Sequence, residues 1–172
     1  RVDVPETLSL PAETLRQIIG VAPGEVFVDD RFVDGVRAAV EEYRRAGFYR
    51  VRAEPTYTEG TSGDARVVLH PNVTEGPRGV VSDVLFRFAT PSAVSEADLR
   101  AAMRSRQGQP FVDLDAAVDA EALRAVFLQR GFRNVQLTLR PEFRDEGRDV
   151  VLTADITPGD LIRIGQTLTI PK

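Results

Sequence analysis

The sequence contains no cysteine, and this absence excludes several kinds of chemistry. Without a thiol the chain has no disulfide, no thiolate nucleophile and no thiolate-bound metal. Histidine is nearly absent too, because His70 is the only one in 172 residues. The usual participants in nucleophilic catalysis are therefore scarce, and no glycine-rich phosphate loop or dinucleotide fingerprint is present.

The chain also lacks an excess of positive charge. It holds 22 Lys and Arg residues against 26 Asp and Glu, and Lys172 is its only lysine. A nucleic-acid surface needs clustered basic residues, so we expect no nucleic-acid partner. No apolar run approaches the roughly 20 residues that cross a bilayer as a helix. The sequence begins at Arg1 with neither a methionine nor a signal sequence, so we take it as a soluble piece of a longer protein.

The informative feature of the sequence is an internal repeat. Glycine, aromatic and apolar positions recur in the same order 84 residues later, and the offset falls to 83 after one residue is lost in a turn. Such a match is hard to obtain by chance, so we interpret the chain as two copies of one small unit. The corresponding segments are 24–29 with 108–113, 43–48 with 127–132, and 67–76 with 150–159.

The second copy predicts a strand, two helices and two further strands. Its opening stretch alternates between apolar and polar residues, as a half-buried strand does. Ser95 and Asp98 form a capping box at the start of a short helix, and Gly131 follows the longer helix. The expected elements are strand Val80–Phe88, a helix after Ser95, a helix from near Asp113 to Gly131, and strands Val135–Leu139 and Val150–Ile156.

The first copy predicts the same order. Pro11 fits the first turn of a short helix, and Asp29 or Asp30 can cap the second helix. Gly47 follows that helix as a left-handed C-terminal residue. The second helix carries an apolar stripe made of Phe32, Val36, Val40 and Tyr43. The closing strands are Val51–Tyr57 and Arg66–Val73, joined through residues 59–64.

These elements define the expected fold class and domains. We predict an α+β fold with two tandem β-α-α-β-β units, each a three-stranded mixed sheet covered on one face by two helices. The expected domains are residues 1–78 and 79–160. Residues 161–172 align with the opening strand of the second copy, and we expect them to form a strand or linker toward a further domain.

The order of elements and its signposts resemble the POTRA (polypeptide-transport-associated) family. The first copy carries Gly24-x-x-Phe27, Tyr43-Arg44-Arg45-Ala46-Gly47-Phe48 and Val73-Thr74-Glu75-Gly76. The second copy repeats these motifs but departs from them in two places, with Phe127 for the usual tyrosine and Pro158 for the usual glutamate. The resemblance covers nearly the whole chain.

The resemblance implies a binding role rather than an enzymatic one, with no cofactor and no bound metal. POTRA domains stand on the periplasmic face of the bacterial outer membrane, before a membrane-embedded β-barrel that assembles or translocates other proteins. By resemblance, the partners are unfolded outer-membrane or secreted polypeptides, and accessory assembly subunits. They are received by β-strand addition, in which a client backbone pairs with an open sheet edge.

The resemblance places the receiving edge on the strand that follows the second helix of each unit. Pro55 removes one donor from the first edge, so we expect the second unit to be the better docking site. The expected edge residues are Val51, Arg52, Ala53 and Glu54 in the first unit, and Val135, Gln136, Leu137, Thr138 and Leu139 in the second.

Some residues suggest other sites. Asp113, Asp115 and Asp119 could hold a hard cation, but they lack the glycine and terminal glutamate of a calcium loop, so capping and a solvated acidic first turn explain them better. We expect His70 to be an ordinary strand residue, because its counterpart in the other copy is Thr153. Tyr43, Phe48 and Tyr49 could form a peptide-binding patch, although we expect Tyr43 and Phe48 in the core.

Two other readings keep similar elements but change the function. RNA-binding KH domains also place two helices after a strand, yet they need a Gly-x-x-Gly loop between the helices, and here that loop is Gly20-Val21-Ala22-Pro23-Gly24. POTRA-like domains also occur in a cell-division protein and in two-partner secretion transporters. The tandem copies disfavour the division protein but leave barrel assembly and secretion open.

Overall fold

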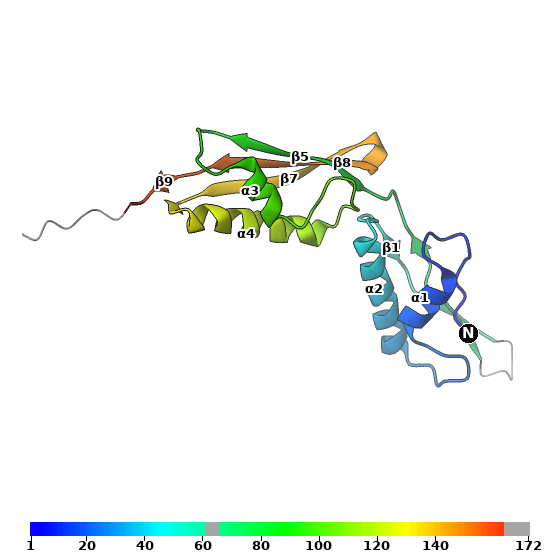
Figure 1. The fold of residues 1–172 in the computed structure, drawn as a ribbon. Helices are drawn as coiled ribbons and strands as arrows, with labels where there is room; N and C mark the ends of the chain where they lie inside the picture. Colours follow the sequence, from blue (N-terminus) through cyan, green and yellow to red (C-terminus); the bar gives the residue numbers. More distant parts are fainter. Residues whose placement is uncertain (61–65, 164–172) are drawn as a thin grey trace, which may run out of the picture. The chain divides into compact units, whose positions relative to one another are not determined.

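The computed structural model describes residues 1–60 and 66–163, and its contacts divide the chain into two compact units (Figure 1). The first unit contains residues 1–80 with segments 110–112 and 145–148, and the second contains the other described residues from 81 onward. Two expected features lie outside the described residues: most of the turn at 59–64, and residues 164–172 of the final segment.

Two helices form one layer of the first unit, α1 (Ala12–Ile19) and α2 (Asp29–Arg45). Pro11 is the N-cap of α1, one residue before the helix. The expectation that Asp29 or Asp30 caps α2 is wrong, because Val28 occupies the N-cap position in an extended conformation and no side chain in the described part of the chain caps the helix. Both aspartates lie inside the first turn, where they interact favourably with the positive end of the helix dipole.

The C-terminus of α2 is closed by a Schellman motif. The N–H of Phe48 donates to the carbonyl of Tyr43, and the N–H of Gly47 donates to the carbonyl of Arg44, both at 3.0 Å. Gly47 has a φ of +99°, which confirms the left-handed residue predicted at this position. The reversal turns the chain back so that Phe48 packs edge-on against Tyr43, with ring centroids 5.5 Å apart.

The strands of the first unit form short ladders. Strand β1 (Arg52–Ala53) pairs with β4 (Val73–Thr74), and β2 (Thr56–Glu59) pairs with β3 (Val67–His70), both antiparallel and in one continuous register. Pro55 and Pro71 stand opposite one another in this register and split each predicted strand in two.

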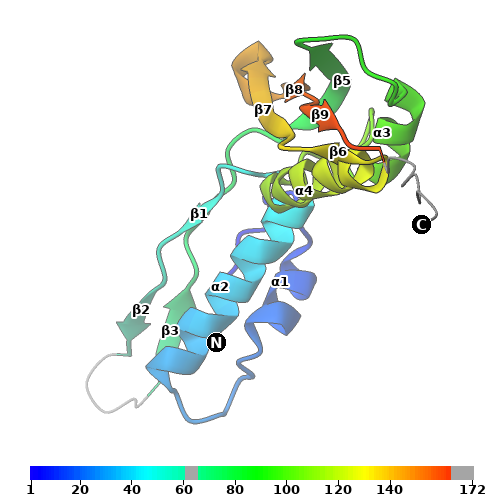
Figure 2. The ribbon, with the colours of Figure 1, turned by 90° about the vertical axis from the view of Figure 1, so that its left-hand side faces the viewer.

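The N-terminal segment completes a mixed sheet in the first unit. Val2 forms a parallel bridge with Leu69, and the backbone of Leu69 exchanges hydrogen bonds of 2.8 Å with Arg1 and Asp3. The β3–β4 segment is therefore the middle of the sheet, and α1 and α2 lie on one side of it (Figure 2). The largest fully buried side chains of the core are Tyr43, Phe32, Leu15 and Leu69, so Tyr43 and Phe48 are core residues, as expected.

The second unit repeats this topology with longer strands. Its sheet has the order β5–β8–β7, with α3 and α4 on one side (Figure 1). Hydrogen bonds from Ser82 to Val150 and from Ala89 to Ile156 show that β5 and β8 run in the same direction, while β7 and β8 are antiparallel. The elements are β5 (Val80–Phe88), α3 (Glu96–Ala102), α4 (Asp113–Gln129), β6 (Phe132–Arg133), β7 (Gln136–Arg144), the 3-10 turn η1 (Asp145–Gly147), β8 (Asp149–Thr157) and β9 (Asp160–Leu161).

The α+β fold class is thus confirmed: each unit has a three-stranded mixed sheet with two helices on one face. The Ser95 cap is confirmed as well, since its side chain accepts a hydrogen bond of 3.2 Å from the N–H of Asp98. The Asp98 carboxylate binds Arg130 at 2.8 Å, so it serves as an ion-pair partner. Beyond the third strand, β9 pairs with β6.

Candidate functional site: the open sheet edges

In the first unit, the strand made of β1 and β2 is an edge of the sheet. Among the described residues it pairs only with β4 and β3. The backbone of Leu69 bonds to the N-terminal segment, so its partner Tyr57 directs its own N–H and C=O away from β3. Alternation along the same register gives Ala53, Pro55 and Tyr57 this outward orientation, and we call these three residues the first edge.

The four residues expected at this edge are not equivalent. Ala53 presents its backbone groups outward, whereas Arg52 faces β4. The Glu54 backbone also faces inward, donating to the Asn72 carbonyl at 3.3 Å and accepting from the Asn72 side chain at 2.9 Å. The Val51 N–H donates to the Phe48 carbonyl at 3.0 Å. Only Ala53 therefore offers both an outward N–H and an outward carbonyl.

A groove of about 570 Å³ runs between α2 and the first edge. Helix α2 and strand β1, which line it, lie side by side in the ribbon (Figure 2). Charged side chains of both signs stand along it, among them Arg37, Glu41 and Arg52. Its apolar lining is made of Val33, Val36 and Val40 from α2, and of Val51, Ala53 and Pro55 from the strand segment.

Arg44 gives the groove a polar feature of its own. Its Nη1 atom donates to Glu41 at 2.9 Å, and Arg45 pairs with Glu42 in the same way, so these four side chains form an ion-pair face on α2. The Nε atom of Arg44 is buried and has no hydrogen-bond acceptor in the described part of the chain. A buried donor without an acceptor is costly, so this atom is a local source of instability beside the groove.

In the second unit, β7 is the corresponding edge strand, and among residues 81–163 it pairs only with β8. The Ile156 carbonyl accepts from Ala89, so Ile156 faces β5 and its partner Leu137 faces outward. Leu139 and Pro141 share this orientation, and we call Leu137, Leu139 and Pro141 the second edge. Of the expected residues, Gln136 and Thr138 face β8, and Val135 precedes the strand.

The second edge differs from the first at its Leu137 carbonyl, which accepts a hydrogen bond of 2.7 Å from Nη2 of Arg124. Arg124 also pairs with Glu121, one turn earlier on α4. In the internal repeat, Arg124 corresponds to Val40 and Leu137 corresponds to Ala53. A position that lines the groove in the first unit therefore carries, in the second, a guanidinium bound to the sheet edge.

The alternative cation site is not assembled. Asp113 is exposed in the first turn of α4, and Asp115 lies 3.7 Å from Arg104. Asp119 is fully buried, so the expectation of a solvated acidic turn is wrong for this residue. Its carboxylate accepts from the backbone N–H groups of Arg104 and Ser105. Within residues 1–60 and 66–163, no three His, Cys, Asp or Glu side chains are arranged to hold a metal ion.

His70 lies in β3, as expected. Its Nε2 atom is 3.2 Å from the Thr58 hydroxyl, and its Nδ1 atom is 3.6 Å from the Asp3 carboxylate. Thr58 is on the adjacent strand β2, and Asp3 follows the residue that bridges to Leu69. The three side chains are thus neighbours across the sheet.

The helices of the described residues are all too short or too polar to cross a membrane. The longest two, α2 and α4, have 17 residues each and carry several charged side chains.

Comparison with known proteins agrees with the geometry. Residues 1–76 match the sequence profile of the POTRA family, described as surface antigen variable number repeat. POTRA domains 3–5 of BamA from Haemophilus influenzae superpose with a TM-score of 0.55 at 17% identity, covering 98% of this chain and 71% of that one. No curated protein matches the chain in sequence.

Two further structures are similar. POTRA domains 1–2 of Omp85 from Anabaena give a TM-score of 0.52 at 20% identity, covering 94% of this chain and 93% of that one. BamA from Haemophilus ducreyi lacking POTRA domains 1–3 gives a TM-score of 0.55 at 14% identity. The match covers 91% of this chain but only 28% of that one.

The molecule is therefore a tandem of small α+β domains in which two helices cover one face of a mixed sheet. Residues 1–76 match the POTRA family model, and the two units together have the fold of solved POTRA domains. The resemblance to POTRA domains that the repeated motifs indicated is confirmed.

Sequence reasoning missed three features of the site. The α2–β1 groove depends on how the helix meets the strand, which periodicity alone does not reveal. The burial of Asp119 had no signal in the sequence beyond its helical spacing of four and eight residues from the apolar Leu123 and Phe127. For Arg124 a signal existed, because an arginine replaces Val40 in the repeat.

Proposed function

We propose that this chain is a non-enzymatic polypeptide-binding module that receives an extended protein segment by strand addition. The observation that carries the proposal is the first edge, where Ala53 directs its backbone groups outward beside an apolar groove. An extended segment supplies N–H and C=O groups along one side of its backbone, which is what an open edge pairs with. A helix satisfies its own backbone groups and has none to offer along its length.

The groove indicates which segments fit. Side chains of an added strand point alternately to the two faces of the sheet, so every second residue enters the groove between α2 and the edge. Its valine, alanine and proline lining favours apolar side chains at these positions, and the mixed charges of Arg37 and Glu41 favour neither sign. The client is therefore an unfolded polypeptide with alternating apolar residues, a pattern typical of outer-membrane strands.

The similar structures supply the cellular setting of this proposal. They belong to BamA and Omp85, and a segment with this fold would stand on the periplasmic face of an outer membrane. Its partners there would be unfolded outer-membrane or secreted polypeptides, or an accessory subunit that contributes a strand. Strand addition to a short edge buries little area, so we expect dissociation constants of about 0.1–1 mM for a single segment.

The test is a backbone-amide NMR titration of the 172-residue chain with a nine-residue peptide in which valine or phenylalanine alternates with threonine. Shifts concentrated at Ala53 and Tyr57, together with the groove residues Val36 and Val40, are expected. The control peptide has the same side chains but carries N-methyl groups on the edge-pairing side, which prevents backbone pairing. Equal shifts with both peptides, or none at millimolar peptide, would contradict strand addition.

A further inference from the structure

We infer that the two units are unequal receptors: the first edge receives the client, and Arg124 closes the second edge. This inference rests on the proposed function, since it names which edge performs it. It replaces the expectation, drawn from Pro55, that the second unit is the better docking site.

Proline does not distinguish the two edges. Pro55 lies on the first edge between Ala53 and Tyr57. Because proline has no N–H, no outward-facing N–H is available between these two residues. Pro141 lies on the second edge, where it follows Leu139 in the same outward orientation. Each edge thus loses one donor to proline, and the difference between the units must come from another residue.

Arg124 supplies that difference. A client strand beside β7 would have to donate an N–H to the Leu137 carbonyl, but Nη2 of Arg124 already donates there. Hydrogen bonds with a charged donor are stronger than those between neutral groups, so a neutral client amide would displace the guanidinium at a loss. The side chain also spans from α4 to the strand, through the space that alternate client side chains would enter.

The first unit has the opposite arrangement at the matching positions. Val40 cannot donate a hydrogen bond, and it lines the groove without reaching the Ala53 carbonyl as Arg124 reaches Leu137. Arg44, one turn further along α2, keeps its Nε buried without an acceptor among the described residues, and a shift of its side chain would let this atom donate to a client carbonyl. The counterpart of Arg44 in the second unit is Leu128, which is 54% exposed and whose side chain has no hydrogen-bond donor.

The experiment exchanges the two residues in the full chain. With the alternating peptide, the wild-type protein is expected to show shifts at Ala53 and Tyr57 but none at Leu137 and Leu139. Arg124→Val should add shifts at Leu137 and Leu139, with an affinity for the second edge at least about tenfold higher than in the wild type. Val40→Arg should weaken binding at the first edge by about tenfold.

A matched control separates the edge bond from charge and packing. Glu121→Gln removes the ion-pair partner of Arg124 but leaves Nη2 free to donate to Leu137, so the second edge should stay closed. Amide spectra of each variant show whether both units remain folded, and a gain of site-specific shifts in Arg124→Val cannot arise from loss of structure.

The outcomes distinguish the two proposals. No binding to any variant contradicts strand addition itself. Equal binding at both edges of the wild-type chain overturns the role of Arg124 but leaves the proposed function standing. If Leu137 and Leu139 show no shifts in Arg124→Val while the first edge binds the peptide, the role of Arg124 is also overturned.

Discussion

Gly35 of α2 packs directly against the backbone of Ile19 at the end of α1, so closely that a Cβ atom at position 35 would lie 2.2 Å from the Ile19 carbonyl oxygen. The two helices of the first unit therefore cross at a point where only glycine fits. In the repeat, the same position of the second unit holds Asp119. The first unit thus has a glycine where its two helices meet, and the second unit has a buried carboxylate at the same position of the repeat.

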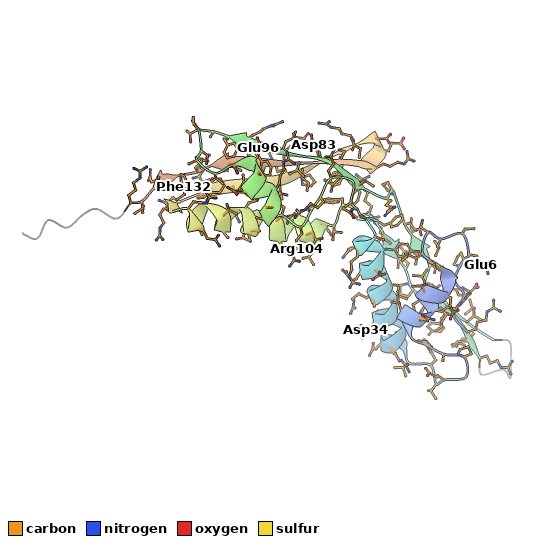
Figure 3. The ribbon with its side chains drawn as sticks, in the orientation of Figure 1. Glu6, Asp34, Asp83, Glu96, Arg104 and Phe132 are labelled. Carbon is orange, nitrogen blue, oxygen red and sulfur yellow. The ribbon has the colours of Figure 1, made fainter. Side chains whose placement is uncertain are left out.

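Gly35→Ala is expected to destabilise the first unit by about 2–3 kcal/mol, since the methyl group would meet backbone atoms that cannot turn away. Alanine otherwise favours a helix by about 1 kcal/mol, so the sign of the effect reports the steric contact. Urea unfolding followed by amide signals of the first unit measures it. The control is Asp34→Ala on the exposed side of the same helix (Figure 3), where only the ion pair with Arg37 is lost and less than about 0.5 kcal/mol is expected. A stabilised Gly35→Ala protein would show that the helices can separate without cost.

Asp119→Ala is expected to destabilise the second unit by about 2 kcal/mol. Its carboxylate accepts N–H groups from Arg104 and Ser105, which follow α3, and alanine leaves both without this acceptor. The same two amides should exchange with solvent faster, as hydrogen exchange would measure. Asp115→Ala is the matched control: it removes only a 3.7 Å ion pair with Arg104, so little change is expected. If both variants lose equal stability, the effect comes from local charge.

Much of the fold could be predicted from the sequence because its signals are local. Gly47 at the end of an apolar stripe predicts a left-handed helix end, and Ser95 predicts a helix start; both are confirmed. The prediction of an aspartate N-cap for α2 was wrong. Asp29 and Val28 are both next to the helix start, and the extended backbone at Val28 makes Val28 the N-cap. Composition cannot reveal that decision, since an aspartate stabilises a helix both as a cap and within the first turn.

The candidate site was less predictable, because it depends on which backbone groups face outward. The predicted segments at Val51 and Val135 locate the edge strands, but outward orientation is fixed by the register against Leu69 and Ile156. Arg124 shows the same limit. The repeat reveals that it replaces Val40, whereas its bond to Leu137 requires the packing of α4 against β7.

Ser9 and Glu75 tie the N-terminal loop of the first unit to the end of β4. The Glu75 carboxylate accepts the Ser9 N–H at 2.6 Å and the Ser9 hydroxyl at 2.7 Å. Glu75→Ala should cost about 1–2 kcal/mol, and Ser9→Ala should cost less because its N–H bond remains. Hydrogen exchange of the Ser9 amide and unfolding of the single and double variants measure this. The double variant should match Glu75→Ala alone, since the interaction is already absent there.

Glu6→Ala is the control for this pair, because Glu6 is an exposed carboxylate in the same loop (Figure 3). It should leave the Ser9 amide protected. The repeat supports the pairing, because the second unit has Ala93 and Pro158 at the corresponding positions and so lacks both partners together. Loss of Ser9 protection in Glu6→Ala would indicate that general loop charge, rather than Glu75, holds the segment.

Tyr43→Phe is expected to leave stability at neutral pH unchanged or to raise it by up to about 1 kcal/mol. The Tyr43 ring is fully buried against Phe48, and phenylalanine keeps this contact. The hydroxyl is buried without a well-formed hydrogen bond among the described residues, so its removal relieves a desolvated polar group. A loss of more than about 1 kcal/mol would show that the hydroxyl makes a stabilising bond in solution.

The same variant tests the alkaline stability of the first unit. Burial raises the pKa of Tyr43 above its ordinary value of 10.0, and the nearby Glu75 carboxylate adds to the shift. Above pH 10.0 the unfolded chain loses this proton while the folded chain keeps it, so the free energy of unfolding falls as pH rises; below that pH the contribution is fully present. Urea unfolding from pH 8 to about 11 should show this decline in the wild type and a smaller one in Tyr43→Phe. Parallel curves for the two proteins would mean that Tyr43 ionises as readily in the folded chain as in the unfolded one.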